Sequence, residues 1–193
     1  MMLYVFLIPL LFGFALAGAS AFTAAYSRRW GERCGQWVTS LLRNVLGIPL
    51  WLFGFVLAWL APAPLLFGST ALLRTLGGLL LAAGLVPVIW AHLLLGWRSH
   101  MPSVRDTLVR HGLYAHVRHP IYAGMLLVFV GLALLRPTWP VVLASAIGAL
   151  WLVLVQARLE ELDLVQRLPA YREYMAEVPR FIPRLRKRGR SIP

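Results

Sequence analysis

Five long apolar stretches constrain this chain more than any other feature of its sequence. They cover residues 3–26, 38–60, 71–95, 120–135 and 138–156. A transmembrane helix needs about 20 mostly apolar residues to cross a hydrocarbon layer about 30 Å thick. The stretches meet or approach that length, and the fourth, reaching ~24 Å at about 1.5 Å per residue, is the shortest. The sequence therefore predicts an all-α integral membrane protein with about five transmembrane helices.

The composition supports one compact membrane domain. Of the 193 residues, 60% are hydrophobic and 13% are charged, against about 45–50% and 25% in soluble domains. These values exclude an ordinary water-soluble enzyme and a disordered chain, and the single Cys34 excludes a disulfide framework within the chain. We expect residues 1–95 to supply three helices. Residues 96–193 are expected to hold a cytoplasmic loop, a helical hairpin that turns at Arg136-Pro137, and a cytoplasmic tail.

Arginines flank the apolar stretches and set the expected orientation. Lys and Arg total 19 against 7 Asp and Glu, a formal net charge of +12. The basic regions follow the first, third and fifth stretches, which places all three on one side of the predicted topology. The positive-inside rule then puts the N-terminus outside the cytoplasm, and the C-terminus and active site inside it. Because these arginines form no separate basic face, we expect no nucleic-acid partner.

Both ends of the chain carry a further expectation. Residues 1–26 are expected to be a membrane anchor rather than a cleaved signal peptide, because arginines follow the apolar run and no basic residue precedes it. The tail is expected to contact anionic phospholipid headgroups. Its basic side chains are Arg180, Arg184, Arg186, Lys187, Arg188 and Arg190.

Polar side chains concentrate around Arg118-His119-Pro120 and around Glu160-Glu161. Proline is favoured in the first turn of a helix, so Pro120 is expected to begin the fourth transmembrane helix. The free N–H groups at such a start suit a carboxylate or a phosphate. The glutamate pair is expected to end the fifth helix at its negative pole, where cations are favoured. The two seats would face each other across one cleft, which suits a zwitterion with an extra positive charge.

Simpler interpretations remain open for these groups. Arg118 and His119 would also suit the membrane interface as snorkelling side chains, and the glutamates would suit a solvated helix end. After the glutamates, helical spacing predicts a short amphipathic lid over the cleft, although core packing would also explain its tyrosines. The spaced residues are Leu164, Val165, Leu168, Tyr171, Tyr174 and Val178.

Two other patterns are assigned to structure rather than chemistry. Small residues recurring on helix faces predict close helix packing, not a dinucleotide-binding loop. They are Gly13, Ala17 and Ala21, and then Gly77, Gly78 and Gly84. The histidines fit no standard metal-site spacing, so no metal is expected. They are His92, His100, His111, His116 and His119.

An ordered set of motifs covers about residues 95–183. It runs Gly112-x-Tyr114-x-x-x-Arg118-His119-Pro120-x-Tyr122-x-Gly124, then the hairpin, then Glu160-Glu161-x-x-Leu164 and Tyr171-x-x-Tyr174-x-x-x-Val178-Pro179. This set resembles the isoprenylcysteine carboxyl methyltransferase family, and the related phospholipid methyltransferases share much of it. The first three stretches match that family only as hydrophobic segments.

The resemblance implies that the cytoplasmic half binds S-adenosylmethionine in a membrane-embedded pocket. It implies catalytic roles for Arg118 and His119 and acceptor-binding roles for Gln156 and Arg158. The implied cofactor contacts are Asp106, Thr107, Leu108, Val109, Tyr114, His119, Pro120, Ile121, Tyr122, and Glu160 or Glu161. The chain departs from the family pattern at two places. The chain has Leu168-Pro169 where the family often has Phe-Gly, and Gln156 where it often has an arginine tied to the acceptor.

The sequence thus predicts an S-adenosylmethionine-dependent methyltransferase acting on a membrane lipid or a lipidated acceptor. A prenylcysteine-like carboxylate is the leading acceptor, and phosphatidylethanolamine-type amines and thiols are alternatives. A carboxylate or thiolate needs no general base, whereas an amine would, and His119 or His116 would then be the candidates. Alternatives of another class are an NADPH-dependent sterol-reductase-like enzyme and a non-catalytic membrane module.

Overall fold

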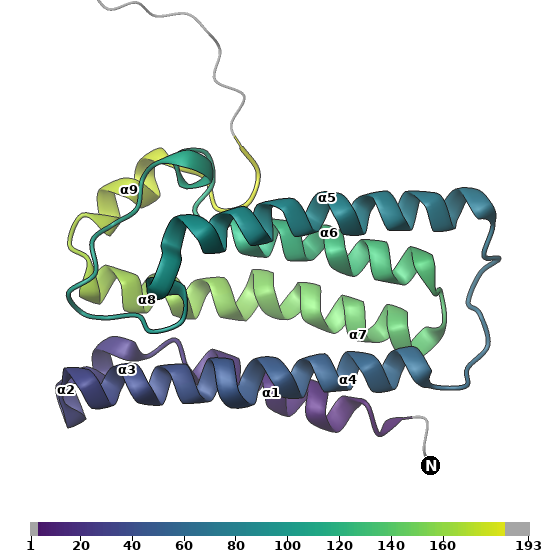
Figure 1. Cartoon of the computed structure of the whole chain (residues 1–193), viewed down its shortest axis with the longest axis horizontal. Coiled ribbons are helices and arrows are strands. Elements are labelled where there is room, and N and C mark those ends of the chain that lie inside the picture. The colour runs from purple at the N-terminus through teal and green to yellow at the C-terminus, as the bar shows by residue number, and fades with distance from the viewer. Residues whose placement is uncertain (1–3, 184–193) are drawn as a thin grey trace, which may run out of the picture.

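The computed structural model describes residues 4–183, and the regular elements in that part of the chain are helices (Figure 1). Two π-helical segments, Leu41–Gly47 and Trp151–Gln156, join α3 to α4 and α7 to α8. Short 3₁₀ turns, Gly96–Ser99 and Gly112–Ala115, lie between α5 and α6. The all-α prediction is confirmed for these residues. The helices are α1 (Leu7–Ala19), α2 (Thr23–Trp30), α3 (Glu32–Ser40), α4 (Ile48–Leu60), α5 (Ala71–Leu95), α6 (Pro120–Leu135), α7 (Trp139–Leu150), α8 (Ala157–Arg167) and α9 (Tyr171–Glu177).

Three continuous helices are long and apolar enough to cross a membrane. They are Glu32–Leu60, Ala71–Ser99 and Trp139–Arg167, each of 29 residues. The bent pair α1 and α2 would add a fourth span. Helix α6 coincides with the predicted stretch 120–135, and its 16 residues are too few for the same length criterion. The chain is therefore an all-helical membrane protein with three to four candidate spans, and the expected number of five is not confirmed.

The first predicted span does not run as one helix. Helix α1 ends before Ser20, α2 begins at Thr23, and their axes differ by 62°. The Ser20 hydroxyl donates to the Ala17 carbonyl at 2.6 Å, and Asp163 accepts the Ala24 N–H at 2.7 Å. A carboxylate here satisfies an N–H group that has no partner inside α2. The break in the predicted stretch is thus held by a side chain from α8.

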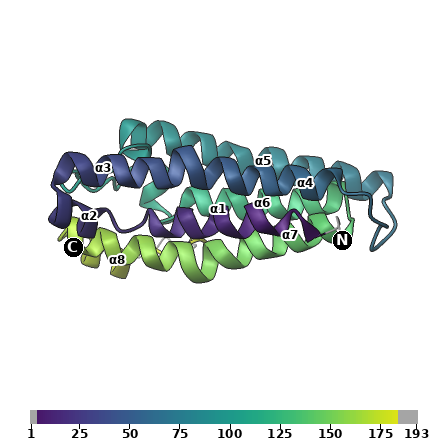
Figure 2. The same ribbon diagram turned by 90° about the horizontal axis from the view of Figure 1, so that it is seen from below.

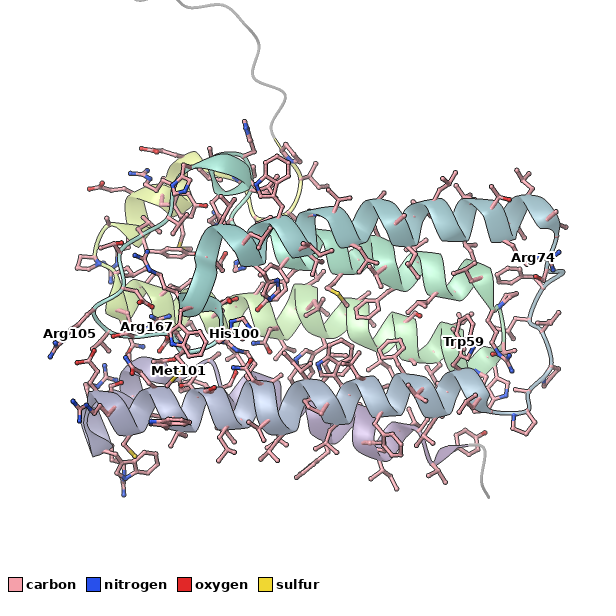
Figure 3. All side chains as sticks on the ribbon, in the orientation of Figure 1. Trp59, Arg74, His100, Met101, Arg105 and Arg167 are labelled. Carbon is pink, nitrogen blue, oxygen red and sulfur yellow. The ribbon has the colours of Figure 1, made fainter. Side chains whose placement is uncertain are left out.

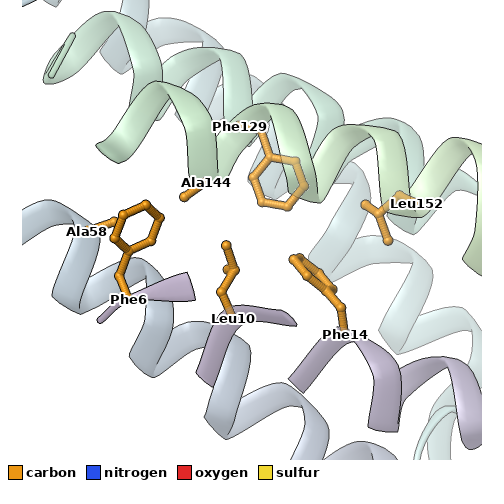
Figure 4. Packing of buried hydrophobic residues seen from close by; sticks show 7 residues of the cluster. All are labelled: Phe6, Leu10, Phe14, Ala58, Phe129, Ala144 and Leu152. Atoms are coloured by element: carbon orange, nitrogen blue, oxygen red, sulfur yellow. The ribbon is translucent and has the colours of Figure 1, made fainter. Parts of the chain in front are cut away.

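The helices pack as two pairs with α7 between them. Figure 1 shows α5 and α6 along one edge of the bundle and α1 and α4 along the other, and Figure 2 shows α1 between α4 and α7. The ring of Phe55 stacks on that of Phe129 with centroids 5.2 Å apart. Packing of this kind drives helix association in lipid, where apolar burial alone cannot. The buried cluster (Figure 4) comprises Phe6, Leu10, Phe14, Ala58, Phe129, Ala144 and Leu152.

The two ends of the bundle differ in polarity. The polar end holds α2, α8, α9 and the connection 96–119, so the three basic regions lie together as the predicted topology requires (Figure 1). Figure 3 places Arg105 and Arg167 at this end, and Arg74 and Trp59 at the other. At the other end, the Leu66 N–H donates to the Pro137 carbonyl at 2.7 Å. Which end faces the cytoplasm stays a prediction.

The backbones of α5 and α6 approach each other closely at glycines. A Cβ added at Gly77 would lie 2.8 Å from the Gly131 carbonyl oxygen and 3.0 Å from the Leu135 nitrogen. Main-chain atoms within a helix cannot move aside without distorting it. The neighbouring Gly78 has no heavy atom within 4 Å of such a Cβ. The predicted packing role therefore holds for Gly77 and does not extend to Gly78.

These adjacent glycines provide a matched test of the packing. We expect Gly77→Ala to lower the free energy of unfolding by about 1–3 kcal/mol through overpacking. Gly78→Ala is expected to leave it unchanged or raise it by up to about 1 kcal/mol, because alanine is the better helix former. Unfolding of the purified protein in detergent measures both effects. Equal stability of the two variants would contradict the close approach of α5 and α6.

Candidate functional site

The buried carboxylate of Glu161 in α8 organises the polar end. Its side chain is 5% exposed. Arg118 donates to Glu161 Oε1 through Nε at 3.1 Å and Nη2 at 2.9 Å. His119 Nε2 lies 3.1 Å from the same oxygen, and Arg180 donates to both carboxylate oxygens. A buried carboxylate is tolerated only when it is well paired, so we treat these four residues as one unit, the Glu161 cluster.

Arg118 ties the C-terminal segment to the start of α6. Its Nη1 donates to the carbonyls of Met175 and Val178, each at 2.7 Å. Its main-chain N–H donates to the Pro179 carbonyl at 2.9 Å. The guanidinium is thus engaged by protein groups on both of its sides. These contacts suit a positioning role for Arg118, and the catalytic role expected from the sequence stays a prediction.

The same bonds change the anion seat expected at the start of α6. The N–H groups of the two residues before α6 donate to the carbonyls of Pro179 and Arg180, at 2.9 and 3.0 Å. Pro120 lies in the first turn as expected and has no N–H. The first turn still presents the N–H groups of Ile121 and Tyr122, which have no partner inside the helix. The expected anion seat is therefore reduced to the N–H groups of Ile121 and Tyr122.

The first basic residue of the tail also belongs to this cluster. Arg180 donates to Glu161, and its expected contact with lipid headgroups stays a prediction. The other basic residues of the tail lie outside the described residues. These are Arg184, Arg186, Lys187, Arg188 and Arg190.

His119 lies between the two carboxylates of the glutamate pair. Its Nε2 is 3.1 Å from Glu161, its Nδ1 is 3.6 Å from Glu160, and its ring stacks on Tyr122 with centroids 5.2 Å apart. Burial by itself would lower the pKa of His119, but hydrogen bonds and charges of Glu160 and Glu161 outweigh burial and raise it. The environment therefore favours the doubly protonated imidazolium. An imidazolium cannot accept a proton, which argues against His119 as a general base.

Glu160 faces a different environment from its neighbour. Its side chain is 30% exposed, and its Oε2 accepts a hydrogen bond from the Tyr122 hydroxyl at 2.6 Å. No arginine lies within ion-pair distance of it among residues 4–183. Adjacent helical side chains diverge by about 100°, and here one is enclosed by cations while the other lines a cavity.

The glutamate pair does not lie at a helix end. The helix that begins as α7 continues without a break through α8 to Arg167, about two turns beyond Glu160. The effect of a helix dipole falls off within the last turn. The expected negative pole is therefore absent at Glu160, and the carboxylate itself supplies the negative charge.

A cavity of ≈ 450 Å³ opens at the polar end and extends into the bundle. All but two of the predicted site residues line it; Glu161 lies behind the wall, and Arg158 is exposed elsewhere on α8. The inner part is apolar, with walls that include Phe14, Trp51 and Met125. The predicted residues that line the cavity are Asp106, Thr107, Leu108, Val109, Tyr114, Arg118, His119, Pro120, Ile121, Tyr122, Gln156 and Glu160.

Helix α9 forms one wall of this cavity. Leu168, Tyr171 and Tyr174 line the cavity and also form a buried cluster with Val178. The Tyr174 hydroxyl donates to the Tyr114 carbonyl at 2.6 Å, and burial raises the pKa of Tyr174 to about 12. The tyrosines therefore combine core packing with cavity lining. That α9 acts as a movable lid stays a prediction.

The loop that contains Asp106 is anchored from α8. Arg167 Nη1 donates to the Ser103 carbonyl at 2.7 Å, and its Nε donates to Asp163 at 2.6 Å. Asp106 in turn accepts the Ser103 N–H at 2.8 Å. Asp163 also caps α2, so one ion pair connects the bend after α1 to the predicted cofactor loop.

The sequence analysis missed one wall of the cavity entirely. Arg43 and Asn44 line it from the π-helical segment before α4, and His92 and His100 line it from α5 and the turn that follows. A charged residue inside an apolar stretch is costly and is by default a candidate functional residue. Arg43 lies within the apolar stretch 38–60, so this signal could have identified it as a candidate from the sequence.

Taken together, the cavity offers a carboxylate, two free N–H groups, aromatic faces and an apolar interior. It offers no preformed metal site, because the described residues contain no group of three or more His, Cys, Asp or Glu that could hold a metal ion. His116, the second candidate base, is exposed and does not line the cavity. The arrangement suits a polar, cationic ligand beside an apolar one.

Comparisons with known proteins agree with this arrangement. The family profile described as "Phospholipid methyltransferase" matches residues 72–168, which begin inside α5 and end just after α8. A relative from Cupriavidus metallidurans, named cobalt-zinc-cadmium resistance protein CzcN, is 31% identical over 153 residues. The match covers 75% of this chain and 66% of that protein, just under two thirds of its length. No solved structure matches the chain.

The raised pKa of His119 makes stability depend on pH. Below pH 6.5 His119 is protonated in both the folded and unfolded chains, so its pairing with the glutamates contributes fully. As pH rises through the raised folded pKa, the proton leaves and this contribution is lost. We therefore expect the melting temperature of the wild type to fall across this range, and that of His119→Asn to fall less.

His111→Asn is the control, because His111 is exposed and lies outside the Glu161 cluster. Its melting temperature should follow the wild-type curve from about pH 5.5 to about pH 9. Parallel curves for His119→Asn and the wild type would contradict the assignment of a charged His119.

Proposed function

The chain belongs to the phospholipid methyltransferase family, and we propose that it transfers a methyl group from S-adenosylmethionine to a lipophilic acceptor in the membrane. One observation carries the proposal. Glu160 presents a carboxylate to the cavity that no arginine of residues 4–183 neutralises, beside an apolar interior of the same cavity. A cationic donor and an apolar acceptor would meet there.

The groups around Glu160 fit S-adenosylmethionine, whose methionine end carries an ammonium, a carboxylate and a sulfonium. Glu160 would accept the ammonium, and the N–H groups of Ile121 and Tyr122 would donate to the carboxylate. The apolar and aromatic faces of Leu108 and Tyr114 would enclose the adenosine part. When bound, the cofactor supplies a methyl group activated by its sulfonium.

The contribution of the chain to this reaction is positioning and the exclusion of water. Methyl transfer is an in-line displacement, so it depends on the alignment of donor and acceptor. The Glu161 cluster fixes the start of α6 and the segment after α9 against α8. Tyr171 and Tyr174 cover the polar part of the cavity, which limits hydrolysis of the reactive donor.

The environment of His119 bears on the acceptor. Because the two glutamates raise the pKa of His119, and His116 is exposed away from the cavity, neither histidine is well suited to remove a proton from an amine. A carboxylate or thiolate is nucleophilic without such a step. This supports a carboxylate acceptor of the prenylcysteine type as the first candidate and a thiol as the second.

The printed name of the relative from C. metallidurans associates that protein with resistance to cobalt, zinc and cadmium. That name says nothing of methyl transfer, which we propose for this chain from the family profile. A nicotinamide-dependent reductase or a non-catalytic module would give Glu160 no evident partner.

Replacing Glu160 tests the cofactor seat. Glutamine keeps the shape and the bond from Tyr122 but removes the charge, so folding should survive. A hydrogen bond to a charged group contributes about 1.5–3 kcal/mol, so Glu160→Gln should weaken S-adenosylmethionine binding roughly 10- to 100-fold. Calorimetry on the purified protein in detergent measures this affinity.

Glu173→Gln is the control, because Glu173 is exposed on α9 and its charge should not matter. Transfer itself is tested by incubating the wild type with methyl-tritiated S-adenosylmethionine and total membrane lipid, followed by mass analysis of the labelled product. Unchanged cofactor affinity in Glu160→Gln would remove the seat. Capture of NADPH without capture of S-adenosylmethionine would favour the reductase.

A further inference from the structure

Arg43 carries a positive charge that no carboxylate balances in the described part of the chain. It takes part in none of the ion pairs formed between residues 4 and 183. Its Nη2 donates to the Ser99 carbonyl, and its Nε is buried without an acceptor. Native structures rarely leave a buried donor unsatisfied unless it has a use. The side chain lines the cavity, so a ligand there would meet an unbalanced cation.

The backbone is modified where Arg43 lies. Residues Leu41–Gly47 form a π-helical segment inside the long helix Glu32–Leu60. Such segments are rare and are frequent at functional sites. The i→i+5 bonding of a π turn aligns residues five apart, so Arg43 shares a face with Ile48 and, one α-helical turn further, with Leu52. All three side chains line the cavity.

A second π-helical segment lies across the cavity. It covers Trp151–Gln156 and ends at Gln156, a buried side chain that also lines the cavity. Tyr122 and Glu160 line the same cavity as Arg43, so this cation shares the cavity with the groups assigned to the methyl donor. The two π-helical segments therefore line the proposed site from two sides.

The wall below Arg43 changes from polar to apolar. Ile48 and Leu52 continue its face toward the interior of the bundle, and Phe14 and Trp51, which stack with centroids 5.6 Å apart, line the same region. A molecule lying along this wall would place an anionic group at Arg43 and an apolar chain beyond it. That is the chemistry of an amphiphile with an oxyanion in its head.

A purely structural role for Arg43 explains less. Its bond to the Ser99 carbonyl does join the π-helical segment Leu41–Gly47 to the turn after α5, but Asn44 makes an equivalent bond to the His100 carbonyl at 2.8 Å. A guanidinium has five N–H donors, and that role uses one of them. It accounts neither for the charge nor for the exposure of Arg43 to the cavity.

We infer that Arg43 is a specificity-determining residue, which binds a carboxylate or phosphate oxyanion of the methyl acceptor while the apolar part of the acceptor lies along Ile48 and Leu52. This inference rests on the proposed function, because it names the acceptor side of the same cavity. Arg43 lies outside the residues 72–168 that match the family profile.

Tetradecyl phosphate and tetradecanol, both tritiated, test the inference as matched probes with and without an oxyanion. The full chain is placed in phosphatidylcholine nanodiscs, and partition into empty nanodiscs is subtracted. Arg43→Gln should weaken binding of tetradecyl phosphate about 10- to 100-fold and change tetradecanol binding by less than about twofold. Arg43→Lys keeps the charge but loses the planar guanidinium that can bond an oxyanion through two N–H groups. Its affinity for tetradecyl phosphate should lie between those of the wild type and Arg43→Gln.

Arg74→Gln is the matched control. Arg74 is exposed at the opposite end of the bundle and donates to the Ser69 carbonyl at 3.3 Å, so its substitution removes an arginine charge that lies outside the cavity (Figure 3). Wild-type binding of both probes is expected for Arg74→Gln.

Three results with the two probes would overturn the inference. They are wild-type phosphate binding in Arg43→Gln, a parallel loss of both probes, and absence of saturable phosphate binding in the wild type. Binding of S-adenosylmethionine is measured on the same samples. A loss of cofactor affinity in Arg43→Gln would assign Arg43 to the donor and also overturn the inference. Absence of cofactor binding in the wild type would contradict the proposed function. The comparison of tetradecyl phosphate with tetradecanol would still test oxyanion binding by Arg43.

Discussion

The pairing of Glu161 with Arg118, His119 and Arg180 is the interaction on which the polar end of this protein depends. A carboxylate with 5% exposure requires close cationic partners, since the cost of burying a lone charge exceeds any single bond. The partners come from the start of α6 and from the segment after α9, and Glu161 itself comes from α8. One side chain therefore draws three segments of the chain together. Residues at the start of α6 and in α8 line the cavity, so that contact fixes part of its polar wall.

Two adjacent glutamates take opposite roles through helix geometry alone. Their side chains diverge by about 100°, so when Glu161 is directed at the cations, Glu160 is directed at the cavity. His119 lies between them and links the structural carboxylate to the exposed one. The family to which the chain belongs acts by methyl transfer, and the environment of Glu160 supports a cationic donor at that position. Arg43 on the facing wall carries a positive charge that is unpaired among residues 4–183, and this charge would bind the oxyanion of the acceptor.

Hydropathy was sufficient to place α5 and α6, whose bounds coincide with the predicted stretches 71–95 and 120–135. Hydropathy failed where a helix begins or ends at a different residue from the apolar stretch. Helix α8 continues to Arg167 through polar residues beyond the apolar stretch, and the bend before α2 is held by Asp163, 139 residues from its partner Ala24. The residues around the cavity were predicted by resemblance, but their separate roles depend on tertiary pairing that no local pattern encodes. Arg43 differs from these residues, because a charge within an apolar stretch is a local signal that could have identified it from the sequence.

The division of labour between the two glutamates is the central claim, and the free energy of unfolding tests it most directly. Glu161→Gln and Glu160→Gln change the same atoms at neighbouring positions of one helix. Loss of one partner from a buried ion pair costs about 3–5 kcal/mol, so Glu161→Gln should destabilise the protein by that amount. Glu160→Gln, which keeps its bond from Tyr122, should cost less than about 1 kcal/mol. Equal destabilisation by the two substitutions, measured by denaturant titration of the detergent-solubilised protein, would contradict the account.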